Sequence, residues 1–337
     1  MSDYMPFHVV WALTNACNVK CIHCYAASKN RSPDELTTNE VLNHLELLAR
    51  DGLLDVAFSG GEPLLVRSLE CIAEKASDLG LTVGVGTNGW ALTPKRAKSL
   101  AQAGVTRIQI SLDGLAQTHD SIRGRKGLFE KSRKAIDNSK DAGITTKVCF
   151  TVHRLNWQEL IPAFEYALSA GVDGFNLSQL VPTGRGNTEI DLDPHEWREI
   201  LEWWDSARRE HPSITMTTHL AQLAMVAPDL ACNPLFQGCQ AARGQGAISP
   251  TGDVYPCVVL PYSIGNLRKN SFKYLWNNSP TAVRLRDRNQ LLGLCGKCVF
   301  RDKCGGCRAT AYAVTGNLMA TDPHCWINNQ ASCESAS

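Results

Sequence analysis

The sequence predicts an α/β protein in which a partial (β/α)6 TIM barrel precedes a small cysteine-rich module. Strand-like segments alternate with helical segments of about 10–15 residues up to position 180, which is the pattern of βαβ units and a parallel sheet. Six such units are present, so an incomplete barrel of six strands fits better than a complete barrel of eight. Eight of the 14 cysteines lie between Cys232 and Cys325, and this shift in composition indicates a separate C-terminal module.

The elements follow from the spacing of apolar residues. The first predicted strand, residues 9–15, is a short apolar run that leads directly into a group of cysteines. Val41, Leu45 and Leu48 share one face of a helix predicted over 37–51. The same alternation predicts strands at 55–59, 81–87, 106–112, 144–152 and 173–180, and helices at 68–79, 94–103, 128–142 and 157–170.

Further elements are predicted beyond the six units. The helix at 195–209 carries a stripe of Trp and aliphatic residues that should face the core. Residues 247–257 read as a hairpin that turns at Pro250-Thr251-Gly252-Asp253. We therefore expect a barrel domain over 1–212, a linker over 213–231 and a cysteine-rich domain over 232–337. Cys71 lies in a predicted helix and Cys149 in a predicted strand, so both are expected to be buried small hydrophobic residues.

Composition narrows the class of protein. Hydrophobic residues make up 44% and charged residues 20%, which is ordinary for a globular chain, and the formal net charge is +1. No bulk charge favours nucleic acid or a membrane surface, and no apolar run approaches the ~20 residues that span a bilayer. Met1 to His8 lacks the pattern of a signal peptide, so a cytoplasmic location is expected. A reducing compartment disfavours disulfides, which makes metal or cluster ligation the better explanation of the cysteines.

The predicted strands end in polar or glycine-rich segments. These segments are Thr14-Asn15, Ser59-Gly60-Gly61-Glu62-Pro63, Thr87-Asn88-Gly89, Ser111-Leu112-Asp113-Gly114, Val152-His153-Arg154 and Leu180-Val181-Pro182. In parallel barrels the chemistry gathers at the carboxyl ends of the strands. The sequence therefore predicts one site assembled from several strand ends.

Cys17, Cys21 and Cys24 place three thiolates within eight residues, directly after the first strand. A zinc site would need a fourth ligand, and His23 is the only local candidate. Three thiolates are one fewer than a [4Fe–4S] cluster needs. The remaining iron could bind the amino and carboxylate groups of S-adenosylmethionine, and an electron from the cluster could then release a 5′-deoxyadenosyl radical.

This cysteine loop, followed after the second strand by Gly60-Gly61-Glu62-Pro63, resembles the radical SAM superfamily over roughly residues 8–185. The resemblance implies that Cys17, Cys21 and Cys24 hold the catalytic cluster. It also implies that His23 lies against the adenine and that the Gly-Gly-Glu-Pro segment holds the methionyl amino group. Thr87, Asn88, Ser111 and Asp113 match positions that line the ribose and the methionyl carboxylate, although Asn-Gly and Asp-Gly are also ordinary turn formers.

The C-terminal cysteines look like the SPASM extension of radical SAM enzymes, with two residues rather than the usual three between Cys304 and Cys307. The resemblance implies that the module holds two auxiliary [4Fe–4S] clusters, so that the chain would carry three clusters in all. The alternative is a zinc-binding module. The first auxiliary set would be Cys232, Cys239, Cys257 and Cys307, and the second Cys295, Cys298, Cys304 and Cys325. No role is assigned to Cys333.

The segments 256–268 and 304–309 are similar to two subfamilies, the tetrapyrrole side-chain enzymes of haem b and haem d1 synthesis and the mycofactocin-type peptide maturases. The resemblance implies oxidative C–C cleavage, by decarboxylation or deacetylation, of a tetrapyrrole precursor. The main alternative is the maturation of a ribosomally synthesised peptide or protein. Two further alternatives are the dehydrogenation of a small-molecule alcohol and a non-enzymatic scaffold role. Arg185, Arg243 and Arg308 are candidate partners for tetrapyrrole carboxylates. A low-potential donor, flavodoxin or ferredoxin, is the expected protein partner.

Overall fold

A single ten-stranded sheet organises residues 4–327, the part of the chain that the computed structural model describes. The strand order is β10-β9-β8-β1-β2-β3-β4-β5-β6-β7, and all neighbours from β8 to β7 run parallel. Only the pairs β8–β9 and β9–β10 are antiparallel. The strands are β1 His8–Ala12, β2 Asp55–Ser59, β3 Thr82–Thr87, β4 Val105–Ser111, β5 Thr145–Val152, β6 Gly174–Gln179, β7 Thr215–Thr218, β8 Gln245–Ile248, β9 Asp253–Tyr255 and β10 Gly265–Asn266.

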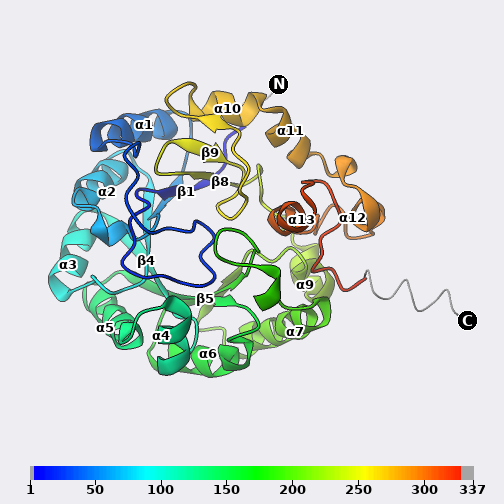
Figure 1. Ribbon diagram of the computed structural model, residues 1–337, viewed down its shortest axis with the longest axis horizontal. Coiled ribbons are helices and arrows are strands. Elements are labelled where there is room, and N and C mark those ends of the chain that lie inside the picture. Colours follow the sequence, from blue (N-terminus) through cyan, green and yellow to red (C-terminus); the bar gives the residue numbers. More distant parts are fainter. Residues whose placement is uncertain (1–3, 328–337) are drawn as a thin grey trace, which may run out of the picture.

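The sheet curls into an open barrel, and helices form a ring around its outer face (Figure 1). The helices of the ring are α1 Thr38–Arg50, α2 Leu69–Asp78, α3 Pro94–Gln102, α4 Ala116–Arg123, α5 Leu128–Asp141, α6 Leu160–Ser169 and α7 Pro194–Glu210. The later helices are α8 Leu223–Val226, α9 Pro228–Cys232, α10 Phe272–Asn278, α11 Pro280–Arg286, α12 Gly293–Lys297 and α13 Arg308–Thr315. Short 3₁₀ turns occupy Pro63–Leu65, Trp157–Glu159, Thr188–Ile190 and Arg288–Gln290.

The six predicted strands correspond to β1–β6, and the predicted hairpin at 247–257 corresponds to β8 and β9. The sequence analysis missed α4 and expected a linker where β7, α8 and α9 lie. Strand β7 reads Thr-Met-Thr-Thr, and such a short polar run carries no alternation of apolar residues. It forms because it completes the parallel edge beside β6.

Cys71 and Cys149 were both expected to be buried, and the structure places them differently. Cys71 is exposed, which contradicts the expectation that it is buried, because the buried face of α2 consists of Leu69, Ile72, Ala73 and Ala76. Cys149 is only partly exposed and points to the inner face of the sheet, where its sulfur contacts the Asn176 side chain at 3.3 Å.

The two faces of the barrel sheet differ in polarity. Fully buried aliphatic residues such as Ile108 and Ile110 alternate along β4 with the polar Arg107, Gln109 and Ser111. Polar groups also meet across the inner face, where the Asp55 carboxylate accepts hydrogen bonds from the His8 and Arg107 side chains. A TIM barrel usually fills its interior with bulky branched residues. The polar, partly accessible inner face of this barrel instead leaves room for a ligand.

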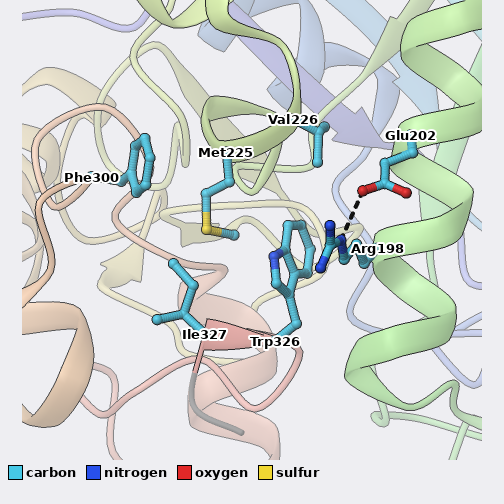
Figure 2. A pocket seen from close by; sticks show the side chains of 7 residues that line it. All are labelled: Arg198, Glu202, Met225, Val226, Phe300, Trp326 and Ile327. Atoms are coloured by element: carbon cyan, nitrogen blue, oxygen red, sulfur yellow. Dashed lines mark hydrogen bonds and ion pairs between the residues drawn. The ribbon is translucent and has the colours of Figure 1, made fainter. Parts of the chain in front are cut away.

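The C-terminal region is joined to the barrel by strand pairing, since β8 lies parallel to β1 from His8 to Trp11. On the outside, a hollow of about 380 Å³ lies where the segment after α13 meets α7 and α8 (Figure 2). It is lined by Arg198, Glu202, Met225, Val226, Phe300, Trp326 and Ile327. In residues 4–327, no helix is both long enough and apolar enough to cross a membrane.

Candidate functional site

The loop that carries the three-cysteine motif is anchored by hydrogen bonds within the chain. The carboxylate of Glu35 accepts hydrogen bonds from the Thr14 hydroxyl at 3.0 and 3.1 Å and from the Asn15 amide at 2.7 Å. The amide of Cys17 donates to the Lys29 carbonyl at 3.2 Å. The backbone on both sides of the motif is therefore held at the carboxyl end of β1.

The thiols of this loop lie close enough to influence one another. Burial, helped by Glu62 and by the neighbouring Cys21 and Cys24 thiols, raises the pKa of Cys17 to about 11. Burial also raises the pKa of Cys21, while the Arg123 guanidinium, 3.7 Å from its sulfur, opposes that rise. Thiolates are the form that binds metal, so cations at this point would be needed to ionise them. Three grouped thiols, of which Cys21 is buried and Cys17 and Cys24 are partly exposed, fit an iron–sulfur cluster in which one iron is left without a protein ligand.

Among residues 4–327, no three His, Cys, Asp or Glu side chains converge on a point where one metal ion could sit. A cubane cluster offers a separate iron to each thiolate, so its ligands need not converge in this way. Cys17, Cys21 and Cys24 form no disulfide and are available as ligands.

The Gly-Gly-Glu-Pro segment packs directly against the cysteine loop. Gly60 has a φ of +138°, and a Cβ at Gly61 would lie 2.2 Å from the Ala16 carbonyl oxygen. The Gly61 amide donates to the Thr14 carbonyl at 2.6 Å, and the Glu62 amide donates to Ala16 at 2.9 Å. The close backbone approach that calls for glycine is thus to the loop itself.

Glu62 is fully buried and joins two strand ends. Its carboxylate accepts hydrogen bonds from the Thr87 hydroxyl at 2.7 Å, the Asn88 amide at 2.8 Å and the Leu64 amide at 3.1 Å. Burial raises the pKa of Glu62, and these donors oppose the rise. Asn88 in turn donates from its side chain to Asn18 in the cysteine loop at 2.7 Å. The predicted residues after β2 and β3 therefore form one connected group.

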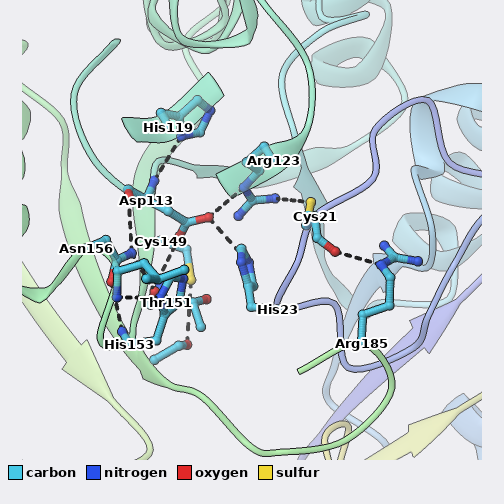
Figure 3. A network of polar contacts seen from close by, with 12 residues as sticks. Cys21, His23, Asp113, His119, Arg123, Cys149, Thr151, His153, Asn156 and Arg185 are labelled. Carbon is cyan, nitrogen blue, oxygen red and sulfur yellow. Dashed lines mark hydrogen bonds and ion pairs between the residues drawn. The ribbon is translucent and has the colours of Figure 1, made fainter. Parts of the chain in front are cut away.

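Asp113, directly beyond β4, is the centre of a second polar network (Figure 3). Its carboxylate accepts hydrogen bonds from Arg123 at 2.6 Å and from the Thr151 amide at 2.8 Å, and lies 3.4 Å from the His23 ring. Burial opposes the ionisation of Asp113, but the positive charge of Arg123, the nearby His23 and His119 rings and the Thr151 amide together outweigh it and hold the pKa of this carboxyl well below its usual range. Since both carboxylate oxygens are already engaged, Asp113 positions its neighbours.

Neutral imidazoles surround this network. Burial lowers the pKa of His23 to about 3 and that of His119 to about 4. The rings of His23 and His153 lie 5.4 Å apart, and each keeps one buried ring nitrogen without a hydrogen-bond partner in the described structure. Neutral rings with a free nitrogen can contact a heterocycle or donate to a ligand.

Arg123 and His119 were not predicted, and His153 was predicted only as part of a strand-end segment, without a role of its own. A usable signal was present, because His119 and Arg123 are four residues apart on α4 and therefore share the face turned toward Asp113. Arg123 brings a buried positive charge beside both Asp113 and Cys21. Ser111, which was predicted, ends β4 on the polar face in register with Cys149.

A cavity of about 250 Å³ separates the cysteine loop from the β8–β9 hairpin. Tyr25, one residue after Cys24, lines it and hydrogen-bonds to Ser59, and burial raises the pKa of this tyrosine to about 12. No charged side chain belongs to the lining, which comprises Val10, Ala12, Asn15, Tyr25, Ala26, Ser28, Gly60, Thr183, Ala247, Ile248, Ser249, Pro250, Thr251, Tyr255, Val258, Val259, Leu260 and Pro261.

The C-terminal cysteines fall into two groups by their electrostatic influence. Burial and the neighbouring Cys239 thiol together raise the pKa of Cys257 and of Cys307 to about 12. Burial likewise raises the pKa of Cys304, and there the contributing cysteines are Cys295 and Cys325. The grouping parallels the predicted division into two sets. Cys298 lies two residues before Phe300, whose amide donates to its sulfur, and Cys232 is exposed at the end of α9.

The three candidate arginines differ in what their side chains contact. Arg185 donates to the Cys21 carbonyl at 2.7 Å and to the Ser28 carbonyl at 2.9 Å, beside the cavity. Arg243 is half-buried and donates to Gln237 at 3.0 Å. Arg308 is only 2% exposed, and its guanidinium donates to the carbonyls of Gly306, Leu318 and Ala320 and contacts the Cys295 sulfur at 3.8 Å.

Both the barrel region and the C-terminal region of the chain match known protein families. Residues 11–167 match the family described as the radical SAM superfamily, and residues 239–299 match SPASM, described as an iron-sulfur cluster-binding domain. The chain is 34% identical to the AdoMet-dependent heme synthase of Methanosarcina barkeri, over 95% of this chain and 96% of that protein. It is 32% identical to the pre-heme d1 synthase of Dinoroseobacter shibae, over 95% and 86%. It is 33% identical to the mycofactocin maturase MftC of Mycolicibacterium smegmatis, over 95% and 82%.

Solved structures share the fold at low identity. Streptococcus suis SuiB bound to S-adenosylmethionine superposes with a TM-score of 0.77 at 18% identity, over 96% of this chain and 78% of that chain. The enzyme anSMEcpe with bound AdoMet and a peptide gives a TM-score of 0.75 at 18% identity, over 97% and 95%.

Proposed function

The chain belongs to the radical SAM superfamily and carries a SPASM iron-sulfur cluster-binding domain, and from this premise we propose that it oxidatively removes a carboxyl-derived fragment from a tetrapyrrole side chain. When bound at Cys17, Cys21 and Cys24, a [4Fe–4S] cluster with S-adenosylmethionine supplies the 5′-deoxyadenosyl radical that abstracts hydrogen from the substrate. Flavodoxin or ferredoxin is the proposed electron donor.

We propose that the chain's own residues hold S-adenosylmethionine through the two networks described above. The Gly60–Pro63 segment offers backbone carbonyls to the methionyl amino group, and Glu62 keeps that segment joined to Thr87 and Asn88. Arg123 supplies the buried positive charge that a carboxylate would pair with. His23 offers a neutral ring face to the adenine, and Ser111 and Asp113 border the ribose.

Two auxiliary clusters are proposed for the C-terminal region, one on Cys232, Cys239, Cys257 and Cys307 and the other on Cys295, Cys298, Cys304 and Cys325. Their proposed work is to accept the electron that remains when a substrate radical loses a carboxyl-derived fragment. The mutual influence of Cys239, Cys257 and Cys307 supports the first set. The proposed extents of barrel, linker and cluster domain remain 1–212, 213–231 and 232–337.

The uncharged cavity between the cysteine loop and the β8–β9 hairpin is the observation that carries the substrate proposal. Walls of aliphatic and aromatic side chains suit contact with the apolar ring of a macrocycle, whose carboxylates need cations only at the rim. Arg185 donates to Ser28, which lines that cavity, and so stands at such a rim. The similarity to a peptide maturase keeps a ribosomally synthesised peptide as the second candidate.

The test uses anaerobically reconstituted, reduced protein with S-adenosylmethionine and either 12,18-didecarboxysiroheme or Fe-coproporphyrin III. We expect 5′-deoxyadenosine to form in proportion to a loss of carboxyl-derived mass from one of these porphyrins, and both to vanish in Cys21→Ala. Uncoupled cleavage with both porphyrins unchanged would reject the tetrapyrrole proposal and favour the peptide. A Cys71→Ala variant, altered at an exposed cysteine outside both networks, is the matched control and should behave as the wild type.

A further inference from the structure

Trp90, in the loop that follows β3, covers the outer side of the cysteine loop. Its side chain packs with Val19, Leu128 and the three cysteines of the motif in an apolar cluster that is separate from the main core. The indole is only partly buried, so part of it reaches the surface of the protein. An aromatic ring therefore forms part of the wall between the three thiols and the solvent.

Positive side chains surround this ring. The guanidinium carbon of Arg125 lies 3.4 Å from the centre of the Trp90 ring, and the ammonium group of Lys131 lies 5.5 Å from it. Lys20, which belongs to the cysteine loop, is exposed beside the same segment, since its amide donates to the Arg123 carbonyl at 3.1 Å. The surface over the motif is thus aromatic at its centre and cationic around it.

The positive charge of the chain is concentrated in this region. Residues 120–134 contain six basic and two acidic residues, so this segment alone carries a net charge of +4 in a chain whose formal net charge is +1. Both acids are engaged, because Asp120 accepts backbone amides at the start of α5 and Glu130 pairs with Arg133 at 3.1 Å. The lysines of the segment are exposed and form no ion pair within residues 4–327: Lys126, Lys131 and Lys134.

A second basic run, residues 284–303, has the same net charge but offers fewer free cations. Arg286 and Arg288 donate to backbone carbonyls and are largely withdrawn from the surface. Arg301 pairs with Asp302 at 3.1 Å. Exposed, unpaired charges are therefore more numerous beside Trp90.

A cationic rim around an aromatic centre favours a transient protein partner of opposite charge, because rim charges steer the encounter and aromatic residues supply the contact. The cluster proposed for the cysteine loop needs an electron from outside, and a carrier must approach that loop closely to deliver it. We propose that Trp90 and the surrounding Lys20, Lys126 and Lys131 form the docking surface for an acidic one-electron carrier protein. One electron passes from the reduced carrier to the cluster, no bond forms or breaks, and the carrier leaves oxidised by one electron.

This inference rests on the proposed function and gives its electron donor a place on the molecule. The substrate cavity borders the other side of the cysteine loop, where the β8–β9 hairpin lies. The strand order places β8 and β3 on opposite sides of β1 and β2, and in Figure 1 the hairpin and α5 lie across the loop from one another. A carrier docked at Trp90 would therefore leave the cavity free, so that an electron could be delivered with substrate in place.

The experiment measures docking and electron delivery separately. The affinity of oxidised flavodoxin for the anaerobically reconstituted protein is measured at low and at high salt. Formation of 5′-deoxyadenosine is then driven either by reduced flavodoxin or by photoreduced deazariboflavin, a small uncharged reductant. We expect Lys126→Glu/Lys131→Glu to weaken flavodoxin binding about tenfold at low salt, as loss of about 1.4 kcal/mol would, and to remove most of its salt dependence. Turnover should fall with flavodoxin and stay within twofold with deazariboflavin.

The matched control is Lys269→Glu/Lys297→Glu, which reverses two exposed lysines of the C-terminal region and should bind flavodoxin as the wild type does. Weaker binding in this pair, with wild-type binding in Lys126→Glu/Lys131→Glu, would overturn the proposal and move the docking surface to the C-terminal region. A wild type that bound neither flavodoxin nor a ferredoxin, or bound a single-stranded oligonucleotide in their place, would also overturn it. Turnover with deazariboflavin would leave the proposed function standing in each of these cases. If neither reductant supported 5′-deoxyadenosine formation, the proposed function would be rejected, and the docking surface would be judged by the affinities alone.

Discussion

Single buried residues, above all Asp113, hold the parts of this site together. Asp113 contacts Arg123, the His23 ring and the Thr151 amide, so one carboxylate relates the end of β4 to α4, to the end of β5 and to the cysteine loop. A buried ion pair of this kind is retained for placement, because its desolvation offsets much of its attraction. Burial keeps the neighbouring His23 and His119 rings neutral, and folding stability therefore depends on pH.

We expect His119 to make folding stability fall as the pH decreases from about 6.5 toward 4. Burial lowers its folded-state pKa to about 4, whereas in the unfolded chain a histidine titrates near 6.5. Within this window the unfolded chain binds a proton that the folded chain does not, so the stabilisation is complete above it and is lost on acidification. His119→Gln should lessen the slope by up to about 1.4 kcal/mol per pH unit.

The measurement is denaturant unfolding from pH 4.5 to 7 on wild type and variant reconstituted in parallel, so that acid loss of clusters affects both alike. His195→Gln, at an exposed position, should keep the wild-type slope. Equal slopes for wild type and His119→Gln would show that the ring is not held neutral.

At the scale of elements, the contact between the β2 end and the cysteine loop depends on glycine. Gly61→Ala would place a methyl group 2.2 Å from the Ala16 carbonyl oxygen, where only backbone could yield. We expect a loss of about 3 kcal/mol in unfolding free energy and poorer iron incorporation at the first motif. Gly86→Ala on β3 is the control, because its nearest neighbour would be the Ser59 hydroxyl at 3.9 Å. Equal stability of the two variants would contradict the tight packing.

The two proposed cysteine sets make a prediction about metal content. Cys257→Ala and Cys304→Ala should each lower the iron bound per reconstituted chain from about 12 to about 8 atoms, because each removes one of two separate cubanes. The double variant should fall to about 4, and Cys71→Ala should stay at the wild-type value. Iron analysis with Mössbauer spectroscopy checks this. A double variant no lower than the single ones would place both cysteines on the same cluster.

The elements also show what sequence could and could not predict. Strands with apolar residues on one face were predicted to within about three residues at either end, because the alternation of apolar residues is a local pattern. Strand β7 was missed, since a polar strand is specified by the edge of β6 that it completes. Arg123 was missed because its partner, Asp113, lies elsewhere in the sequence and only folding brings the two together.

At the scale of the whole molecule, the barrel and the cluster domain share one sheet. Strand β1 pairs with β2 on one side and with β8 on the other. A chain that stops at residue 231 would leave the β8 side of β1 as an open parallel edge, and exposed edges pair with other chains. We expect this truncated chain to self-associate.

Light scattering after size-exclusion chromatography tests the truncation. The control is full-length Cys304→Ala, which keeps β8 but is expected to lack one cluster. It separates the effect of losing the strand from the effect of losing metal, and it should remain as dispersed as the wild type. A truncated chain that stays equally dispersed would show that the barrel closes without β8.

The pairing of β1 with β8 also sets an order of events during synthesis. Strand β1 leaves the ribosome first, but β8 lies beyond the entire barrel sequence and follows it by roughly 10 to 50 s at ordinary rates of translation. Contacts so distant along the chain form late. The cysteine loop that continues from β1 is therefore among the first segments made and among the last to be enclosed, which gives the cell an interval in which to deliver iron and sulfide to it.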